Sequence, residues 1–261
     1  MNPFGNVRGT YRQIRLTAGW TLFLAPLLII AVAYLIEPAI QPTLSHYYFV
    51  EPKPGLVRTM FTGFLIFVGG ILVAYRGFDT RDNWIHNAAG IFAVCVAIFP
   101  KHCDPTGEPY CYPGLLGSLH QPAAMLLFFF AGWAVVYCGG PVFLGQLQED
   151  ELRTLKRAKK ASLTTMTIGA LLYLVRPFLP AAIQEFKITT LLVELLGFFG
   201  FAAHWLVMTR VISTANVRRR EERRAAREGK RALAAEVETE KVLPEESMEI
   251  DAEGEGALEI P

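Results

Sequence analysis

Six polar side chains that could do chemistry stand in or beside the short polar stretches that interrupt long apolar runs. They are Ser45, His46, His102, Asp104, His120 and Glu194. Zinc in a hydrolytic site takes three protein ligands, often histidine or carboxylate, and keeps one position open for water. Three histidines of this set could therefore hold a metal ion, and a serine or an acid could hold or activate the water.

Two hypotheses follow from this set. In the first, His46, His102 and His120 are metal ligands, with zinc as the possible ion, and Ser45 and Glu194 are catalytic. In the second, the protein is not an enzyme and the same side chains are structural. The histidines are not spaced as a compact motif such as HExxH, and we favour the second hypothesis. No residue is assigned to an organic cofactor.

The elements that must position these residues are apolar helices. Hydrophobic residues make up 52% of the 261 positions, which is too many for an ordinary soluble domain. A bilayer core of roughly 30 Å needs roughly 20 apolar residues in a helix. Six stretches meet or approach this length: residues 19–40, 56–75, 84–99, 119–138, 163–179 and 188–211. We therefore predict an all-α integral membrane bundle of six transmembrane helices, the first of which is retained rather than cleaved as a signal peptide.

Lysine and arginine near the helix ends predict the orientation, because cytoplasmic segments are enriched in both. Basic residues are frequent in residues 8–15, 76–81, 153–160 and 218–231. Both termini are therefore expected in the cytoplasm, with the protein in the bacterial cytoplasmic (inner) membrane. His46 and His120 are then expected to face one cavity at the outer end, with Glu194 lining it. His86 and His204 lie toward the cytoplasmic end, as interfacial or core residues.

Two pairings are expected at the outer end. Glu194 and Arg176 lie at similar depth on consecutive predicted helices, and a charge facing lipid is costly, so we expect an ion pair. Cys103 and Cys111 share one polar loop and could form a disulfide in an oxidising compartment.

The stretch "YRGFDTRDN" is predicted to be a tight cytoplasmic turn. Gly77 can adopt a positive φ, and Asp79 or Asp82 can cap the next helix. This structural role accounts for the stretch, so Asp79 is not placed in a site.

The chain is expected to divide into a cytoplasmic N-terminal segment (1–18), a membrane domain (19–212) and a largely disordered cytoplasmic tail (213–261). Residues 218–231 are strongly basic and helix-prone, and they form either a solvated flank or a patch on anionic lipid headgroups. From Glu236 the tail is acidic and expected to be disordered. Nucleic acid is not an expected partner, since no aromatic-rich basic fold accompanies the charge.

Four stretches in order resemble a family of bacterial multispan membrane proteins described as domain of unknown function 998. They are "LSHYYF", "FTGFLIFVGGILVAYRGFDTRDN", "NAAGIFAVCVAIFP" and "GSLHQPAAMLLFFFAGW". The family pattern falls on Ser45, Tyr47, Tyr48, Tyr75, Arg76, Gly77, Asp79, Ala89, Gly90, Phe99, Pro100, Gly117 and His120. Phe78 replaces a tyrosine of that pattern. The resemblance covers residues 45–133 and implies a multispan membrane fold without a settled activity.

More remotely, the serine, aspartate and histidine residues are similar to those of alkaline ceramidase and adiponectin-receptor-like membrane hydrolases. That resemblance implies zinc held by three histidines and an aspartate in a seven-helix bundle. This chain departs from it, with six predicted helices and no HxxxH pair.

These observations together favour a multi-pass membrane protein that is a transporter or an accessory membrane component with an outward-facing polar cavity. The alternative is a metal-dependent membrane hydrolase that acts on a lipid-like substrate. Beyond the lipid bilayer, the sequence names no partner.

Overall fold

The structure is a computed structural model of the 261-residue chain. It describes residues 3–50, 55–99, 101, 114–137, 143–175, 178 and 188–242. Within these residues all regular structure is helical, so the predicted all-α class is confirmed. The chain divides into two compact units, Met1–Ser213 and Thr214–Pro261. The first unit contains the helices that position the candidate site residues.

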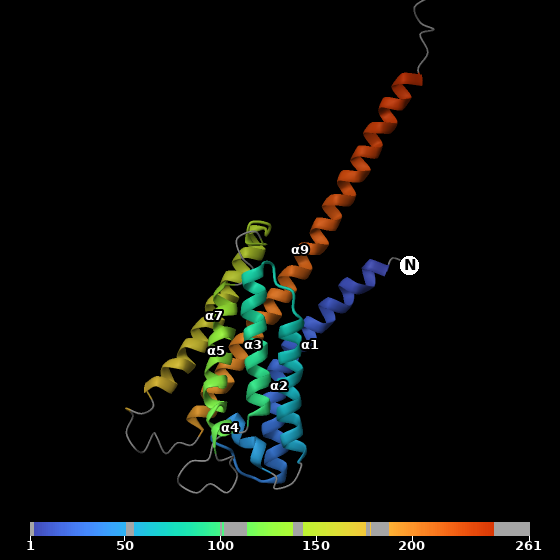
Figure 1. Cartoon of the computed structure of the whole chain (residues 1–261). Helices are drawn as coiled ribbons and strands as arrows, with labels where there is room; N and C mark the ends of the chain where they lie inside the picture. The colour runs from blue at the N-terminus through green and yellow to red at the C-terminus, as the bar shows by residue number, and fades with distance from the viewer. Residues whose placement is uncertain are drawn as a thin grey trace, which may run out of the picture. The chain divides into compact units, whose positions relative to one another are not determined.

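The first unit contains a short 3₁₀ helix, η1, and a set of α-helices (Figure 1). The elements are α1 (Pro3–Ile36), η1 (Leu44–Phe49), α2 (Leu56–Ala74), α3 (Thr80–Ile98), α4 (Leu115–Ser118), α5 (His120–Tyr137), α7 (Glu149–Val175) and the first part of α9 (Thr189–Val242). Helix α2 packs against α1 and α3, and α5 packs against α3 and α7.

Consecutive long helices run in opposite directions, so the unit has two ends (Figure 1). One end carries η1, the beginning of α2, the end of α3 and the beginning of α5. We call it the η1 end. The other end carries the α2–α3 connection and the beginning of α7, and we call it the turn end.

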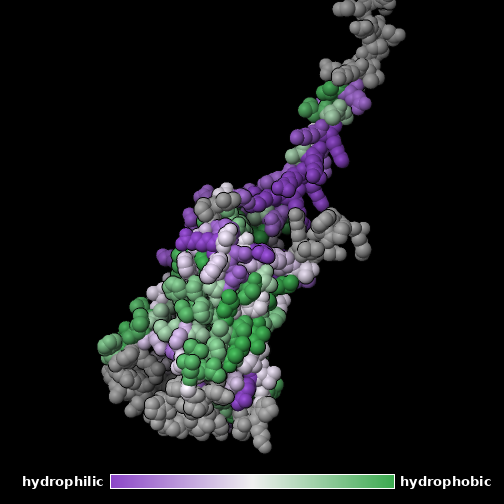
Figure 2. Space-filling view, viewed as in Figure 1, coloured by the Kyte–Doolittle hydropathy of each residue, from purple (hydrophilic) through white to green (hydrophobic). Residues whose placement is uncertain are grey.

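Four helices of the described residues are long and apolar enough to cross a membrane. They are Gly9–Ile36, Leu56–Ala74, Leu115–Tyr137 and Thr189–Glu238. Figure 2 shows hydrophobic side chains covering the middle of the helical body. These features indicate a membrane protein, whereas the predicted count of six spans is not confirmed. The remaining long helices are α3 and α7, whose first turns are polar and shorten the apolar run that each contains.

Helices α2 and α3 approach so closely that their backbones touch. A Cβ atom added to Gly69 would lie 2.7 Å from the carbonyl oxygen of Gly90, and one added to Gly90 would lie 2.6 Å from that of Gly69. Real Cβ atoms do not approach backbone oxygens this closely, so glycine is needed at both positions. Small residues at helix crossings are typical of membrane bundles, because close packing there replaces the hydrophobic driving force.

Apolar side chains fill the middle of the first unit. A cavity of about 20 Å³ lies there, lined by residues of α1, α2, α3, α5 and α9 that include Leu65, Leu127 and Phe198. A volume of this size is close to that of a single water probe, and the lining offers a water molecule no polar partner. The polar groups at the two ends are thus separated by packed apolar side chains.

In the second unit, the described residues are helical. Helix α9 continues through the basic segment to Val242, past Glu236, where the sequence was expected to become disordered. Ala, Glu, Lys and Arg dominate these turns, and all four are strong helix formers. Residues 243–261 lie outside the described part of the chain.

Candidate functional site

The segment η1 forms because local side chains cap and pack it. Thr43 is its N-cap residue, and the Thr43 hydroxyl accepts a hydrogen bond from the backbone N–H of His46 at 3.2 Å. The Tyr47 side chain is fully buried, and its hydroxyl accepts a hydrogen bond from the N–H of Gln41 at 3.2 Å. Burial raises the pKa of the Tyr47 phenol above its ordinary value. This segment is therefore an ordered element rather than a passive connection.

The first contact of η1 with the bundle is to the beginning of α9. The N–H of Leu44 donates to Oε2 of Glu194 at 2.5 Å. One turn earlier on α9, the N–H of Leu191 donates to the carbonyl oxygen of Pro42 at 2.9 Å. The two bonds hold η1 on the first turns of α9. The expected partner of Glu194, Arg176, lies outside the described residues, so that ion pair stays a prediction.

The second contact is a serine–histidine hydrogen bond to α5. Nε2 of His120 lies 2.9 Å from Oγ of Ser45, and Nδ1 lies 2.6 Å from the carbonyl oxygen of Phe99. A carbonyl oxygen only accepts, so Nδ1 carries a proton and donates to Phe99. In the neutral ring, Nε2 then accepts the proton of the Ser45 hydroxyl. Both side chains are buried, with exposed fractions of 8% for Ser45 and 4% for His120.

The third contact joins η1 to Lys101, three residues after the end of α3. Nζ of Lys101 lies 2.6 Å from Nε2 of His46, and Oγ1 of Thr43 lies 2.6 Å from Nδ1. A lysine ammonium only donates, so Nε2 accepts and Nδ1–H donates to Thr43. Lys101, Glu194 and the two histidines His46 and His120 thus all lie at the η1 end.

Four of the five predicted site residues belong to this network, which we call the η1 network: Ser45, His46, His120 and Glu194. His102 lies outside the described residues, as do Cys103, Asp104 and Cys111. Among the residues that are described, no group of three or more His, Cys, Asp or Glu side chains is arranged to hold a metal ion. The assignment of zinc ligands therefore stays a prediction.

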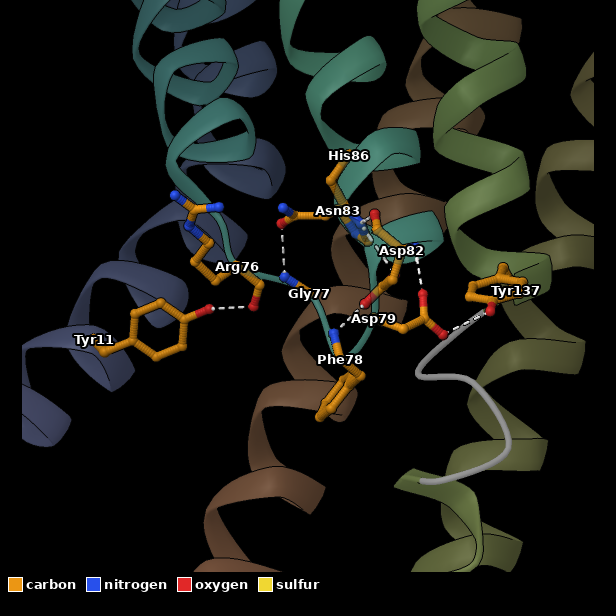
Figure 3. Close-up of polar contacts among 9 residues, drawn as sticks. All are labelled: Tyr11, Arg76, Gly77, Phe78, Asp79, Asp82, Asn83, His86 and Tyr137. Carbon is orange, nitrogen blue, oxygen red and sulfur yellow. Dashed lines mark hydrogen bonds and ion pairs between the residues drawn. The ribbon is translucent and has the colours of Figure 1, made fainter.

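The α2–α3 connection at the turn end is a capped turn (Figure 3). The side chain of Asp79 accepts from the N–H of Asp82 at 2.8 Å, which confirms the predicted N-cap of α3. The hydroxyl of Tyr137, at the end of α5, donates to the second oxygen of Asp79 at 2.6 Å. The hydrogen bond from Asp82, and then that from Tyr137, lower the pKa of the Asp79 carboxyl. On the other side, the Tyr11 hydroxyl of α1 donates to the carbonyl oxygen of Arg76 at 3.1 Å.

Gly77 has a different role in this turn from the one predicted. Among the described glycines, only Gly114 has a positive φ. A Cβ atom on Gly77 would instead lie 2.6 Å from Oδ2 of Asp82 and 2.8 Å from the backbone nitrogen of Asn83. The N–H of Gly77 donates to Oδ1 of Asn83, and that of Phe78 donates to Oδ2 of Asp82, both at 3.0 Å. Glycine is required here because the turn folds closely onto the first residues of α3.

Sequence reasoning missed a cluster of buried ionisable side chains beside this turn. Asp82 and His86 are only 1% and 2% exposed, and Nδ1 of His86 lies 3.2 Å from Oδ1 of Asp82. The His86 ring packs on Tyr75 and Trp205, with ring centroids 4.6 and 5.6 Å away. The spacing of four residues between Asp82 and His86 is the signal that could have identified the pair, since such residues are neighbours on a helix.

Arg15 completes this cluster from α1. Its guanidinium carbon lies 5.0 Å from the ring centroid of Tyr75 and 5.2 Å from that of Trp205. Nε of Arg15 donates to Oγ1 of Thr209 at 3.3 Å, and the indole N–H of Trp205 donates to the carbonyl oxygen of Arg15 at 2.8 Å. Arg15 is 4% exposed. Its contacts with Trp205 and Thr209 join α1 to α9, a role separate from the effect of a basic residue on membrane orientation.

Chemically, the η1 network offers a serine hydroxyl held against a neutral imidazole. A base that is oriented by a third group is the arrangement that activates serine nucleophiles. In the structure, however, Ser45 and His120 satisfy each other and are shielded from solvent.

Comparisons with known proteins complete the description of the site. No protein-family model matches the chain. No curated protein and no solved structure matches it either. The function is therefore argued from the geometry of this chain.

Proposed function

We propose that the chain is a six-span integral protein of the bacterial inner membrane, with both termini in the cytoplasm and the η1 end outside. Four helices have the length and hydropathy of spans, and α3 and α7 pack beside α5. The basic stretches 76–81 and 153–160 both lie at the turn end, as expected of a cytoplasmic face.

Reporter fusions test this topology. Fusions after Pro54 and after Gly107 should behave as external, and fusions between Gln146 and Lys160 as internal. The opposite result at any of these positions would contradict the six-span arrangement.

Within this topology, η1 is the closed gate of a polar site in a transporter or an accessory membrane component that is not an enzyme. The observation that carries the proposal is the attachment of three consecutive residues to three different segments. Leu44 bonds to α9, Ser45 bonds to α5, and His46 bonds to Lys101. A connecting loop needs no such contacts, and polar groups in lipid are retained mainly where they serve a pathway or a partner.

The packing beneath η1 also supports a transporter or an accessory membrane component. The titratable groups of the η1 network and the Arg15–Asp82–His86 cluster lie at opposite ends, and apolar side chains fill the space between them. Polar sites at both ends with a sealed middle are what the closed state of a transporter requires. A hydrolase would need only one of the two ends.

Labelling of a cysteine beneath the gate tests the proposal. Leu191 is 4% exposed and lies under Pro42, so Leu191→Cys is introduced after the native cysteines are replaced by serine. Glu194→Leu removes the acceptor for the Leu44 N–H, whereas Glu194→Gln keeps a carbonyl oxygen there. A membrane-impermeant maleimide should label Leu191→Cys slowly alone and with Glu194→Gln, and several-fold faster with Glu194→Leu. Equal rates in all three would mean that η1 is not a gate held by Glu194.

A second candidate function, a membrane hydrolase, is favoured by the hydrogen bond between Ser45 and His120. A fluorophosphonate probe reacts with activated serines and tests this candidate directly. Labelling that disappears in Ser45→Ala would establish a serine hydrolase. Stoichiometric zinc that survives purification and is removed by a chelator would instead support the metal-dependent form. Neither result is expected if the polar site belongs to a transporter.

A further inference from the structure

Helix α7 carries a groove whose lining changes from basic to apolar along its length. The groove has a volume of about 600 Å³. Lys156, Lys159 and Lys160 line its end nearest the start of the helix, and Leu163, Thr164, Thr167 and Ile168 line the rest. Successive lining residues are separated by spacings that place them on one face of a helix. This lysine groove is therefore continuous rather than a set of scattered side chains.

The charge of the lysine groove is available to a ligand. Lys156 and Lys160 are exposed, and within the described residues neither forms an ion pair with an acidic side chain. Glu149, at the start of α7, forms its ion pair with Arg153 rather than with either of these lysines. Lys159 has a structural role, because its ammonium donates to the carbonyl oxygen of Val136 and so holds α7 on the end of α5.

The apolar part of the groove is open as well. Ile168 is 47% exposed, and Leu171 beyond it is 54% exposed. From Lys160 to Ile168 the helix rises roughly 12 Å, at about 1.5 Å per residue. A ligand that fills this groove must therefore be anionic at one end and carry a long apolar portion at the other.

We propose that the lysine groove binds one anionic phospholipid, with its phosphate at Lys156 and Lys160 and an acyl chain along Leu163, Thr167 and Ile168. The inference rests on the proposed membrane placement, which puts these lysines at the cytoplasmic interface. Clusters of lysine at the cytoplasmic interface attract anionic lipid headgroups. A free phosphate would leave the apolar wall uncovered, so the lipid is the better complement.

Native mass spectrometry of the purified full-length protein in detergent tests the proposal, with phosphatidylglycerol compared against phosphatidylcholine of identical chains. Phosphatidylglycerol should bind about tenfold more tightly, and Lys156→Gln/Lys160→Gln should weaken its binding about tenfold, because the anionic headgroup is attracted to the charge of these two lysines. The matched control, Arg12→Gln/Arg157→Gln, removes the same charge from exposed positions outside the groove and should leave binding unchanged.

Two further arms separate charge from shape. Thr167→Trp fills the groove without changing its charge and should weaken the binding of phosphatidylglycerol. Lys156→Arg/Lys160→Arg keeps the charge and should bind phosphatidylglycerol as the wild type does. These two variants decide the question if the glutamine variant fails to fold. Glycerol phosphate should not displace the lipid, and displacement would identify a free phosphate site instead.

Equal binding of both lipids, or equal binding by the wild type and the folded glutamine variant, would overturn the lipid site. Such a result would leave the proposed gate intact, because that gate is tested by labelling at Leu191.

Discussion

Nε2 of His120 lies 2.9 Å from Oγ of Ser45, a residue 75 positions earlier in the chain. The opposite ring nitrogen of His120 lies 2.6 Å from the carbonyl oxygen of Phe99. The imidazole is thus held on one side by η1 and on the other by the end of α3. The His120 ring, at the start of α5, therefore connects Ser45 of η1 to the end of α3.

Removal of the Ser45 hydroxyl should destabilise the protein. Ser45→Ala leaves Nε2 of a buried histidine without its partner, and we expect a loss of about 1 kcal/mol in the free energy of unfolding. Ser118→Ala is the control, because the Ser118 hydroxyl is exposed and, among the described residues, bonds only to Leu115 in its own turn. That change should stay within about 0.5 kcal/mol. Unfolding in detergent measures both, and equal losses would contradict the account.

The crossing of α2 and α3 should tolerate no added methyl group. Gly69→Ala places a Cβ atom against the Gly90 carbonyl oxygen, and this overpacking should cost about 1–3 kcal/mol. The next residue supplies the control, since a Cβ atom on Gly70 would meet nothing within 4 Å. Gly70→Ala should be neutral or stabilise the helix by up to about 1 kcal/mol. Comparable melting temperatures for the two variants would argue against the close crossing.

Arg15 should resist replacement by lysine. A lysine ammonium keeps the charge but loses the planar guanidinium that packs on Tyr75 and Trp205 and bonds to Thr209. We expect Arg15→Lys to cost about 2 kcal/mol. Arg12→Lys, three residues earlier at an exposed position, should change the free energy of unfolding by less than about 0.5 kcal/mol. The same small effect at both positions would show that Arg15 acts only through its charge.

The helices were predicted best where hydropathy alone defines them. The predicted stretch 56–75 corresponds to α2 (Leu56–Ala74), and 119–138 corresponds to α5 (His120–Tyr137). Three helices begin or end far outside their apolar runs: α1 begins at Pro3, α7 begins at Glu149, and α9 continues to Val242. An apolar run marks the part of a helix suited to lipid, whereas charged turns with high helix propensity extend it without a hydropathy signal.

For the site, the sequence indicated which residues share an end but not which atoms meet. The predicted order and direction of the helices placed Ser45, His120 and Glu194 at the same end, which is the η1 end. It could not show that Glu194 accepts from a backbone N–H, because such a donor carries no side-chain signal. Arg15 was missed for a different reason: a basic residue near a helix end satisfies the positive-inside rule whether it is exposed or buried.

The N-cap at Asp79 should make stability fall in acid. The pKa of this carboxyl is lower in the folded protein than in the unfolded chain, so its contribution is complete above the unfolded pKa of about 4. The contribution is lost as the pH falls through the lower, folded pKa.

Asp79→Asn separates the charge from the cap. Asparagine also caps helices but carries no charge, so at pH 7 the variant should be less stable than the wild type by the amount that the Asp79 charge contributes. Below about pH 4 the wild type should lose stability more steeply than the variant. Parallel curves of unfolding free energy against pH would show that the Asp79 charge contributes nothing.

Hydrogen exchange at the Leu44 amide tests the central claim, that the η1 segment is held closed through Glu194. In nanodiscs, this amide should exchange slowly in the wild type and in Glu194→Gln, since both side chains present an oxygen to the Leu44 N–H. In Glu194→Leu the acceptor is gone, and exchange should be at least about tenfold faster, as expected when a closed segment opens locally. Equal exchange in all three proteins would contradict the claim, because η1 would then be held without Glu194.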